Sequence, residues 1–238
     1  AAALDAASCD IFSDVDGVYT ADPRVVPEAR RIDALAHGAI LEMGLRGARV
    51  LAPEAIDFAR RHGVTLHARS TFSEGGGTVV TSRPHPGSGL ALAVAADSGA
   101  LPARLSLDLD AVDGLLHDLQ AAGLALRDVA LEAGDRAILE LVLDTRNSPE
   151  AGTVLRARAA ARGVELLLFE GLGTATVVGE GIAEQAAAWR IARGALAGLG
   201  LAPRRLLGSP WGLTAQLPRD ALDGVVRAWH GAFPGLAG

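Results

Sequence analysis

The sequence predicts an α/β protein built from two differently organised parts. Up to about residue 80, short apolar runs that suit strands alternate with helical stretches, which is typical of helices packed on a largely parallel sheet. Beyond residue 90, two blocks repeat the order strand, helix, strand, strand, helix, which is typical of ferredoxin-like modules. Thr81–Gly89 (TSRPHPGSG) is rich in Pro, Gly and Ser and marks a boundary. We therefore expect domains at residues 1–80, 90–170 and 171–238, with 81–89 as a linker.

Local signals define the elements of the first part. Pro53 suits the first turn of a helix, and Gly47 and Gly63 suit helix ends. In chain order we expect a helix at Ala1–Ala7, a strand at Cys9–Phe12, a polar loop, a helix from about Glu28 to Leu45, a strand at Arg49–Leu51, a helix at Glu54–Arg61, a strand at Val64–Ala68, a loop at Ser73–Gly77 and a strand at Thr78–Val80.

The two blocks of the second part have matching element orders. In the first we expect strands near 103–107, 126–132 and 137–143, with helices near 110–122 and 149–162. In the second we expect strands near 174–178, 203–207 and 213–217, with helices near 183–198 and 218–232. An outer strand, such as Val164–Phe169 or Leu90–Ala95, can be exchanged between the blocks.

Composition excludes several classes of protein. The chain has 238 residues, of which 50% are hydrophobic and 21% charged, as in an ordinary globular protein. Its net charge of −6 argues against a nucleic-acid partner, which requires a basic surface. No apolar window reaches the length of a membrane span, so we expect no membrane partner. The single cysteine, Cys9, excludes an internal disulfide and suits a cytoplasmic protein.

The stretch SDVDGVYTADPR, residues 13–24, places many polar groups directly after a strand. Ligands of open α/β sheets bind at the carboxyl ends of strands. Aspartates can accept hydrogen bonds from sugar hydroxyls, and a tyrosine ring can lie against a base. An arginine can form a forked contact with phosphate. Glycine permits a backbone conformation closed to other residues. These groups suit a nucleoside triphosphate; the alternative is a turn held by its own hydrogen bonds. The residues concerned are Ser13, Asp14, Asp16, Gly17, Tyr19, Asp22 and Arg24.

The same stretch resembles the nucleotide-binding signature of the aspartate kinases, in the amino-acid kinase superfamily. The resemblance continues through residues 41–80, and the two later blocks resemble the paired ACT domains of that family. It implies the C-terminal part of an amino-acid kinase α/β/α domain, followed by paired ferredoxin-like (βαββαβ) ACT modules. The implied activity is phosphorylation of the β-carboxylate of L-aspartate by ATP with Mg²⁺, the first step toward lysine, threonine and methionine. The implied assembly is a homodimer through the ACT modules.

Matched position by position, the resemblance gives each residue of the stretch a place. It implies that Ser13 and Asp14 lie beside the nucleoside, Tyr19 against the base or ribose, and Asp22 and Arg24 near the phosphates. Arg49 stands where the family usually has lysine, and we count it as a further nucleotide contact. The family's Lys-Phe-Gly-Gly-Thr-Ser and Arg-Gly-Gly-Ser-Asp motifs are not found in residues 1–238. We therefore expect no catalytic residue here and no activity from this chain alone; the alternative is a non-catalytic regulatory or assembly subunit.

The ACT-like modules offer weaker candidates. The family's effector loop corresponds to residues 107–113 in the first module, where Asp110 is expected to cap a helix, and to the stretch from Gly179 in the second, where Ala186-Ala187 continues a helix. The candidate effector positions are Asp108, Asp110 and Ser209. The six histidines show no metal-ligand spacing, so no metal site is expected. The apolar sheet face expected to pair across a two-fold axis comprises Leu105, Leu107, Ile138, Leu141, Leu143 and Trp211.

Overall fold

The structure, a computed structural model, describes residues 1–4, 6–48, 51–72, 75–82 and 91–236. The chain forms two compact units, one made of Ala1–Asp97 and Thr174–Gly238 and the other of Ser98–Gly173, called unit 1 and unit 2 below. Most of the predicted linker at 81–89 lies outside the described residues, as do Arg49 and Val50 of a predicted strand. Among the described residues, no helix has the length and apolar character required to cross a lipid bilayer.

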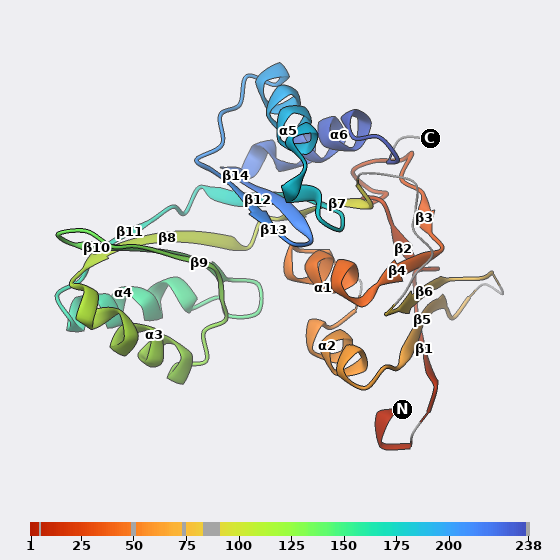
Figure 1. Ribbon diagram of the computed structural model, residues 1–238, viewed down its shortest axis with the longest axis horizontal. Helices are drawn as coiled ribbons and strands as arrows, with labels where there is room; N and C mark the ends of the chain where they lie inside the picture. The colour runs from red at the N-terminus through yellow and green to blue at the C-terminus, as the bar shows by residue number, and fades with distance from the viewer. Residues whose placement is uncertain (5, 49–50, 73–74, 83–90, 237–238) are drawn as a thin grey trace. The chain divides into compact units, whose positions relative to one another are not determined.

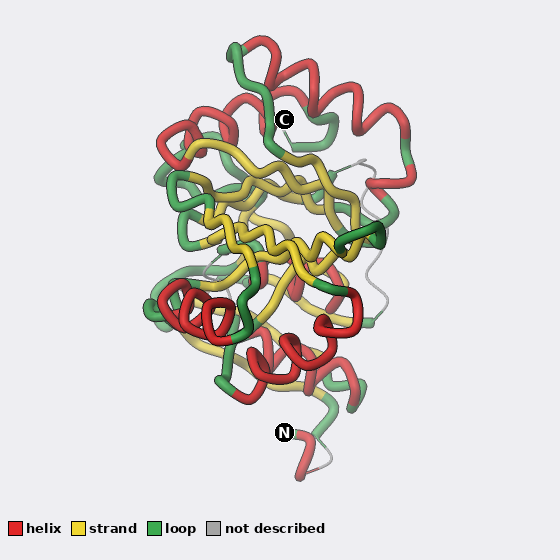
Figure 2. The backbone as a smooth tube through the Cα atoms, turned by 90° about the vertical axis from the view of Figure 1, so that its left-hand side faces the viewer, coloured by secondary structure: helices red, strands yellow, loops and turns green. Residues whose placement is uncertain are grey.

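Unit 2 is a complete ferredoxin-like module. Its sheet has the order β11-β8-β10-β9, and the pairs β8–β10, β9–β10 and β8–β11 are antiparallel. Both helices lie on one face of this sheet, as Figures 1 and 2 show, and enclose a core of leucines. The elements are β8 (Ala100–Leu107), α3 (Val112–Ala121), β9 (Leu126–Glu132), β10 (Ala137–Asp144), α4 (Ala151–Ala161) and β11 (Glu165–Leu168).

Unit 1 contains a second sheet of the same kind, with the order β13-β14-β12-β7. Its elements are β7 (Ala93–Asp97), β12 (Leu172–Val178), α5 (Ala186–Gly198), β13 (Arg205–Ser209), β14 (Gly212–Pro218) and α6 (Leu222–Ala232). α5 and α6 cover one face of this sheet (Figure 1), and Trp229 of α6 and Phe233 just after it are buried in the core of this module. β7 precedes unit 2 in the chain but pairs with β12, which follows it. The fourth strand of this module therefore comes from the segment that precedes unit 2 in the chain, as the predicted exchange of Leu90–Ala95 implies.

The N-terminal part of unit 1 holds a mixed sheet with the order β1-β5-β6-β4. The pairs β1–β5 and β4–β6 are parallel, whereas β5–β6 is antiparallel. The expected helix start at Pro53 is confirmed, because α2 begins there. The elements are β1 (Ser8–Ser13), β2 (Val18–Tyr19), β3 (Arg31–Ile32), β4 (Ala34–Ala36), α1 (His37–Leu45), α2 (Pro53–Arg61), β5 (Thr65–Ser70) and β6 (Thr78–Thr81). Single 3₁₀ turns occur at Ala2–Leu4, Leu109–Ala111, Ile182–Glu184 and Arg219–Ala221.

The predicted helix over Glu28–Leu45 is wrong in its first half. Residues 31–32 pair with Val18 and Tyr19 as an antiparallel ribbon, and Ala34–Ala36 runs parallel to β6. Leu35 is buried in the core by this pairing. Partners distant in sequence therefore override a local pattern that suits a helix.

The predicted two-fold pairing face is also wrong for most of its residues. Leu105, Leu107, Leu141 and Leu143 are buried in the core that unit 2 forms with its own helices. The sides of β8 and β10 that carry these leucines face inward, because alternate residues of a strand point to opposite faces of its sheet. Trp211 instead packs in unit 1 beside α1.

Candidate functional site

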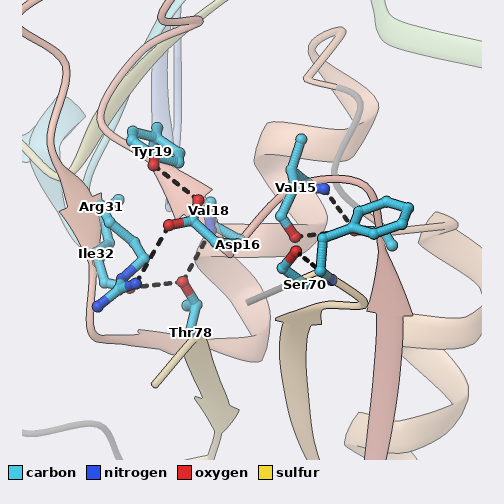
Figure 3. A network of polar contacts seen from close by, with 10 residues as sticks. Val15, Asp16, Val18, Tyr19, Arg31, Ile32, Ser70 and Thr78 are labelled. Carbon is cyan, nitrogen blue, oxygen red and sulfur yellow. Dashed lines mark hydrogen bonds and ion pairs between the residues drawn. The ribbon is translucent and has the colours of Figure 1, made fainter. Parts of the chain in front are cut away.

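Residues 13–24 leave the carboxyl end of β1 beside the carboxyl end of β5. The two strands are parallel and in register up to Ser13 opposite Ser70. The Thr71 backbone N–H donates to the Ser13 carbonyl (2.9 Å), and the Phe72 N–H donates to the Ser70 hydroxyl (3.0 Å). Figure 3 shows Ser70 at the end of β5 and Val15 in the loop that follows β1. The loop therefore occupies the position at which ligands of such sheets bind.

Ser13 and Asp14 form the first turn of the loop. The Ser13 hydroxyl donates to the Val15 carbonyl (3.1 Å) and accepts from the Val15 N–H (3.3 Å). Asp14 is exposed, and within the described part of the chain its carboxylate has no hydrogen-bond partner. Part of the loop is thus a turn stabilised by its own contacts, as the alternative interpretation expects.

Asp16 organises the middle of the loop. Its carboxylate accepts a hydrogen bond from the Tyr19 hydroxyl (2.8 Å) and lies 3.4 Å from the Arg31 guanidinium, as Figure 3 shows. The hydrogen bond to Asp16 and partial burial raise the pKa of Tyr19. Asp16 therefore fixes the orientation of the tyrosine ring that is predicted to lie beside a base or ribose.

Gly17 and Thr78 join the loop to β6. The Thr78 hydroxyl accepts from the buried Val18 N–H (2.8 Å) and donates to the Ile32 carbonyl (2.6 Å). Gly17 has φ +144°, and a Cβ there would lie 2.7 Å from the Thr78 hydroxyl. A side chain at residue 17 would therefore displace the hydroxyl that holds the first residue of β2.

Asp22 and Arg24 form an exposed pair at the end of the loop. The Arg24 guanidinium donates through Nε (3.0 Å) and Nη2 (2.6 Å) to the two oxygens of Asp22. The Arg24 side chain is 79% exposed, and Asp22 raises its pKa. The remaining donors of a guanidinium held in this way can contact an incoming phosphate.

The loop is anchored to the C-terminal part of unit 1. The buried Thr20 hydroxyl lies 2.9 Å from His230 Nε2 of α6 and accepts from the Arg30 N–H (3.0 Å). The Thr20 carbonyl also accepts from the Val94 N–H of β7 (2.8 Å). Burial lowers the pKa of His230, and the charge of Arg30 lowers it further, while Glu28 opposes this. Sequence reasoning missed this anchor, because its partners lie 210 residues apart.

A second contact within unit 1 involves α1. Glu42 accepts hydrogen bonds from Arg46 Nε (3.0 Å) and from the hydroxyl of Ser209, at the end of β13 (3.1 Å). The Trp211 ring lies over Gly38, where a Cβ would come within 2.3 Å of the ring. The structure thus uses Ser209, a predicted effector position, to join α1 to the second ferredoxin-like sheet. Its role toward an effector stays a prediction.

The expected helix cap at Asp110 is wrong, and Asp108, at the N-cap position of a 3₁₀ turn, makes no side-chain capping hydrogen bond. Asp108 and Asp110 are exposed, Asp110 lies within a 3₁₀ turn, and the residue before α3 is Ala111. Asp113 lies in the first turn of α3. Arg49 lies outside the described residues, and among those that are described no cluster of His, Cys, Asp and Glu could hold a metal ion by itself.

Comparisons with known proteins agree on one family. The amino acid kinase family model matches residues 1–70. An aspartokinase of Thermus thermophilus is 30% identical over 251 aligned positions, which cover 98% of this chain and 59% of that protein. An aspartokinase of Mycolicibacterium smegmatis is 50% identical over 80 residues, covering 34% of this chain and 19% of its own. The chain is related to the aspartokinases.

Solved aspartokinase structures extend the similarity to the fold. Escherichia coli aspartokinase III, solved in complex with aspartate and ADP, matches 97% of this chain and 53% of its own, with a TM-score of 0.78 and 26% identity. The regulatory subunit of aspartate kinase from Thermus thermophilus shares the fold over 58% of this chain, with a TM-score of 0.51. The predicted α/β fold class is confirmed. The chain spans 59% of the length of the curated Thermus relative that it matches.

Proposed function

We propose that this chain supplies the nucleotide side of an aspartate kinase, which transfers a phosphoryl group from ATP to the β-carboxylate of L-aspartate. The observation that carries the proposal is the pair formed by Asp22 and Arg24: an exposed guanidinium, held by a forked ion pair, at the end of the loop that follows β1. Phosphoryl transfer depends on positioning and on cationic groups that neutralise phosphate charge. The similarity to aspartokinase III, solved with aspartate and ADP, supports the substrates.

The loop geometry suits a nucleotide in three respects. Tyr19, oriented by Asp16, offers a ring face for a base or ribose. Arg24 offers donors for phosphate oxygens. Mg²⁺ bound with ATP would neutralise phosphate charge, and the exposed carboxylate of Asp14 offers an acceptor for a ribose hydroxyl.

The proposed enzyme needs residues beyond this chain. The chain spans 59% of its Thermus relative, and the family motifs for the triphosphate and for aspartate are not found among its 238 residues. The two ferredoxin-like modules would serve regulation and assembly, with the protein acting as a homodimer in the cytoplasm. The single cysteine suits that compartment.

A second candidate function is a non-catalytic regulatory subunit. The regulatory subunit of aspartate kinase from Thermus thermophilus supports it, because that structure matches the fold of this chain over 95% of its own length. That match covers only 58% of this chain, whereas aspartokinase III matches 97%. The larger match favours the kinase.

The test replaces Arg24 with alanine in the complete protein. Because a charge-assisted contact to phosphate is lost, the apparent affinity for ATP should fall roughly ten- to a hundredfold. Arg60→Ala is the matched control, because Arg60 is also exposed and paired with a nearby aspartate, Asp57. Unchanged ATP kinetics in Arg24→Ala would refute a phosphate role.

The 238-residue chain alone should form no aspartyl phosphate in a hydroxamate assay, and turnover there would refute the need for further residues.

A further inference from the structure

A groove of about 760 Å³ lies in unit 1 between α5 and the segment that leads into β13. Its volume is within the range of small-molecule sites. Trp189, Leu201 and Leu206 contribute apolar side chains, which are half-buried against the core beneath α5 and α6. The Trp189 ring is fixed, because its Nε1 donates to the Ala183 carbonyl (2.7 Å). The groove thus has a rigid apolar surface large enough for an organic molecule.

The charge of this groove is opposite to that of the chain as a whole. Four arginines line it, Arg190 and Arg193 from α5 and Arg204 and Arg205 from the following segment, and no carboxylate belongs to the lining. The whole stretch 185–219 contains five arginines and no aspartate or glutamate, in a chain with a net charge of −6. Such separation of charge creates a local positive potential that attracts anions.

Arginines elsewhere in the structure are mostly paired with carboxylates. Arg24 pairs with Asp22, Arg60 with Asp57, and Arg162 with Asp118. In the groove, by contrast, the exposed side chains of Arg190 and Arg193 have no hydrogen-bond or ion-pair partner within the described part of the chain. The two lie three residues apart on one helix, where like charges repel each other. A bound anion would remove this repulsion.

One of the four arginines is already positioned. Arg204 Nη1 donates to the side-chain oxygen of Gln216 on β14 (2.6 Å), and the Arg204 N–H donates to the Gln216 carbonyl (2.9 Å). The guanidinium of Arg204 is therefore held at one wall of the groove, while Arg190 and Arg193 are free to orient from the helix at the other. A guanidinium has five donors, so this arrangement can bind more than one acidic group at once.

We propose that this groove binds a small organic anion with at least two carboxylate or phosphate groups. The acidic groups contact Arg190, Arg193 and Arg204, and the carbon skeleton packs on Trp189 and Leu201. A concave site of this size suits a small molecule better than a polyanionic polymer, which the net negative charge of the chain would repel. The site is separate from residues 13–24, and the inference does not depend on the proposed kinase activity.

The test titrates the full chain with two probes, citrate and inorganic pyrophosphate, by calorimetry at low ionic strength. We expect saturable binding with one site per chain for at least one probe, and a change in tryptophan fluorescence that is lost in Trp189→Phe. The variant Arg190→Gln/Arg193→Gln should bind at least tenfold more weakly, because each charge-assisted contact is worth a factor of this size. Glutamine is a good helix former, so α5 should persist, which circular dichroism checks.

The matched control is Arg60→Gln/Arg61→Gln, which removes the same charge from α2 and should bind both probes as the unchanged chain does. Equal weakening in both double variants would show diffuse electrostatic attraction and overturn the proposal. So would the absence of saturable binding of either probe, or unchanged binding in Arg190→Gln/Arg193→Gln. Tight binding of heparin alone would assign the surface to a polymer and would equally overturn it.

Discussion

Thr78→Val tests whether one hydroxyl holds the start of β2. Valine has the shape of threonine but cannot accept from the Val18 N–H, which is 2.8 Å from the threonine oxygen. Thr78 and Val18 are each 1% exposed, so water cannot take over that role. A buried N–H left without an acceptor costs about 1 to 3 kcal/mol. At roughly 2 to 4 °C per kcal/mol for a chain of this size, the Tm of unit 1 should fall by about 2 to 12 °C.

The assay is differential scanning calorimetry of the full chain, with Thr78→Ser as the control. Serine keeps the hydroxyl and loses only a methyl group, so it separates the hydrogen bond from packing. If the valine variant melts within about 1 °C of the serine variant, the hydrogen bond contributes nothing and our account of the loop is refuted. The proposed nucleotide site adds a second readout in the complete protein: affinity for ADP should fall with the valine variant.

Two further predictions concern the contacts between the N-terminal and C-terminal parts of unit 1. Burial lowers the pKa of His230 from its usual 6.5. Below pH 6.5 the unfolded chain therefore binds a proton at this histidine more readily than the folded chain does. The free energy of unfolding should fall as the pH drops through 6.5 toward the folded-state pKa. Urea unfolding across this pH range should show a shallower fall for His230→Gln, and identical slopes would exclude the histidine as the cause. Gly38→Ala should destabilise unit 1 by about 1 to 3 kcal/mol despite the better helix propensity of alanine, because its Cβ would lie 2.3 Å from the Trp211 ring. Adding Trp211→Leu should recover part of that loss in chemical denaturation, and a purely additive double variant would contradict the contact.

Elements specified by local signals could be predicted from the sequence. Pro53 at the start of α2 and the two strand-helix-strand-strand-helix blocks are of this kind. Elements specified by distant partners could not: residues 31–36 form strands because Val18, Tyr19 and β6 pair with them. The inward direction of Leu105 and Leu141 depends on which face of the sheet the helices cover, which the alternating pattern alone does not specify.

For the candidate site, too, local features could be predicted from the sequence, whereas contacts between distant residues could not. The sequence indicated which polar groups gather in residues 13–24, but not that Asp16 is bonded to Tyr19 or that Asp22 holds Arg24. It gave no indication that His230 reaches Thr20, since nothing local links α6 to the loop. Contacts of this kind depend on the tertiary fold, so only the structure reveals them.

The pairing of β7 with β12 has a consequence for synthesis of the chain on the ribosome. Asp97 lies opposite Thr174 in the sheet, so all of unit 2 is made after β7 and before its partner strand. Unit 2 is a contiguous segment and can complete its own sheet while β7 still has no partner strand. During that interval the apolar strand Ala93–Asp97 has a free edge, which is the kind of surface that chaperones bind and that aggregation exploits. Translation speed through Ser98–Gly173 therefore sets how long the nascent chain carries this exposed edge.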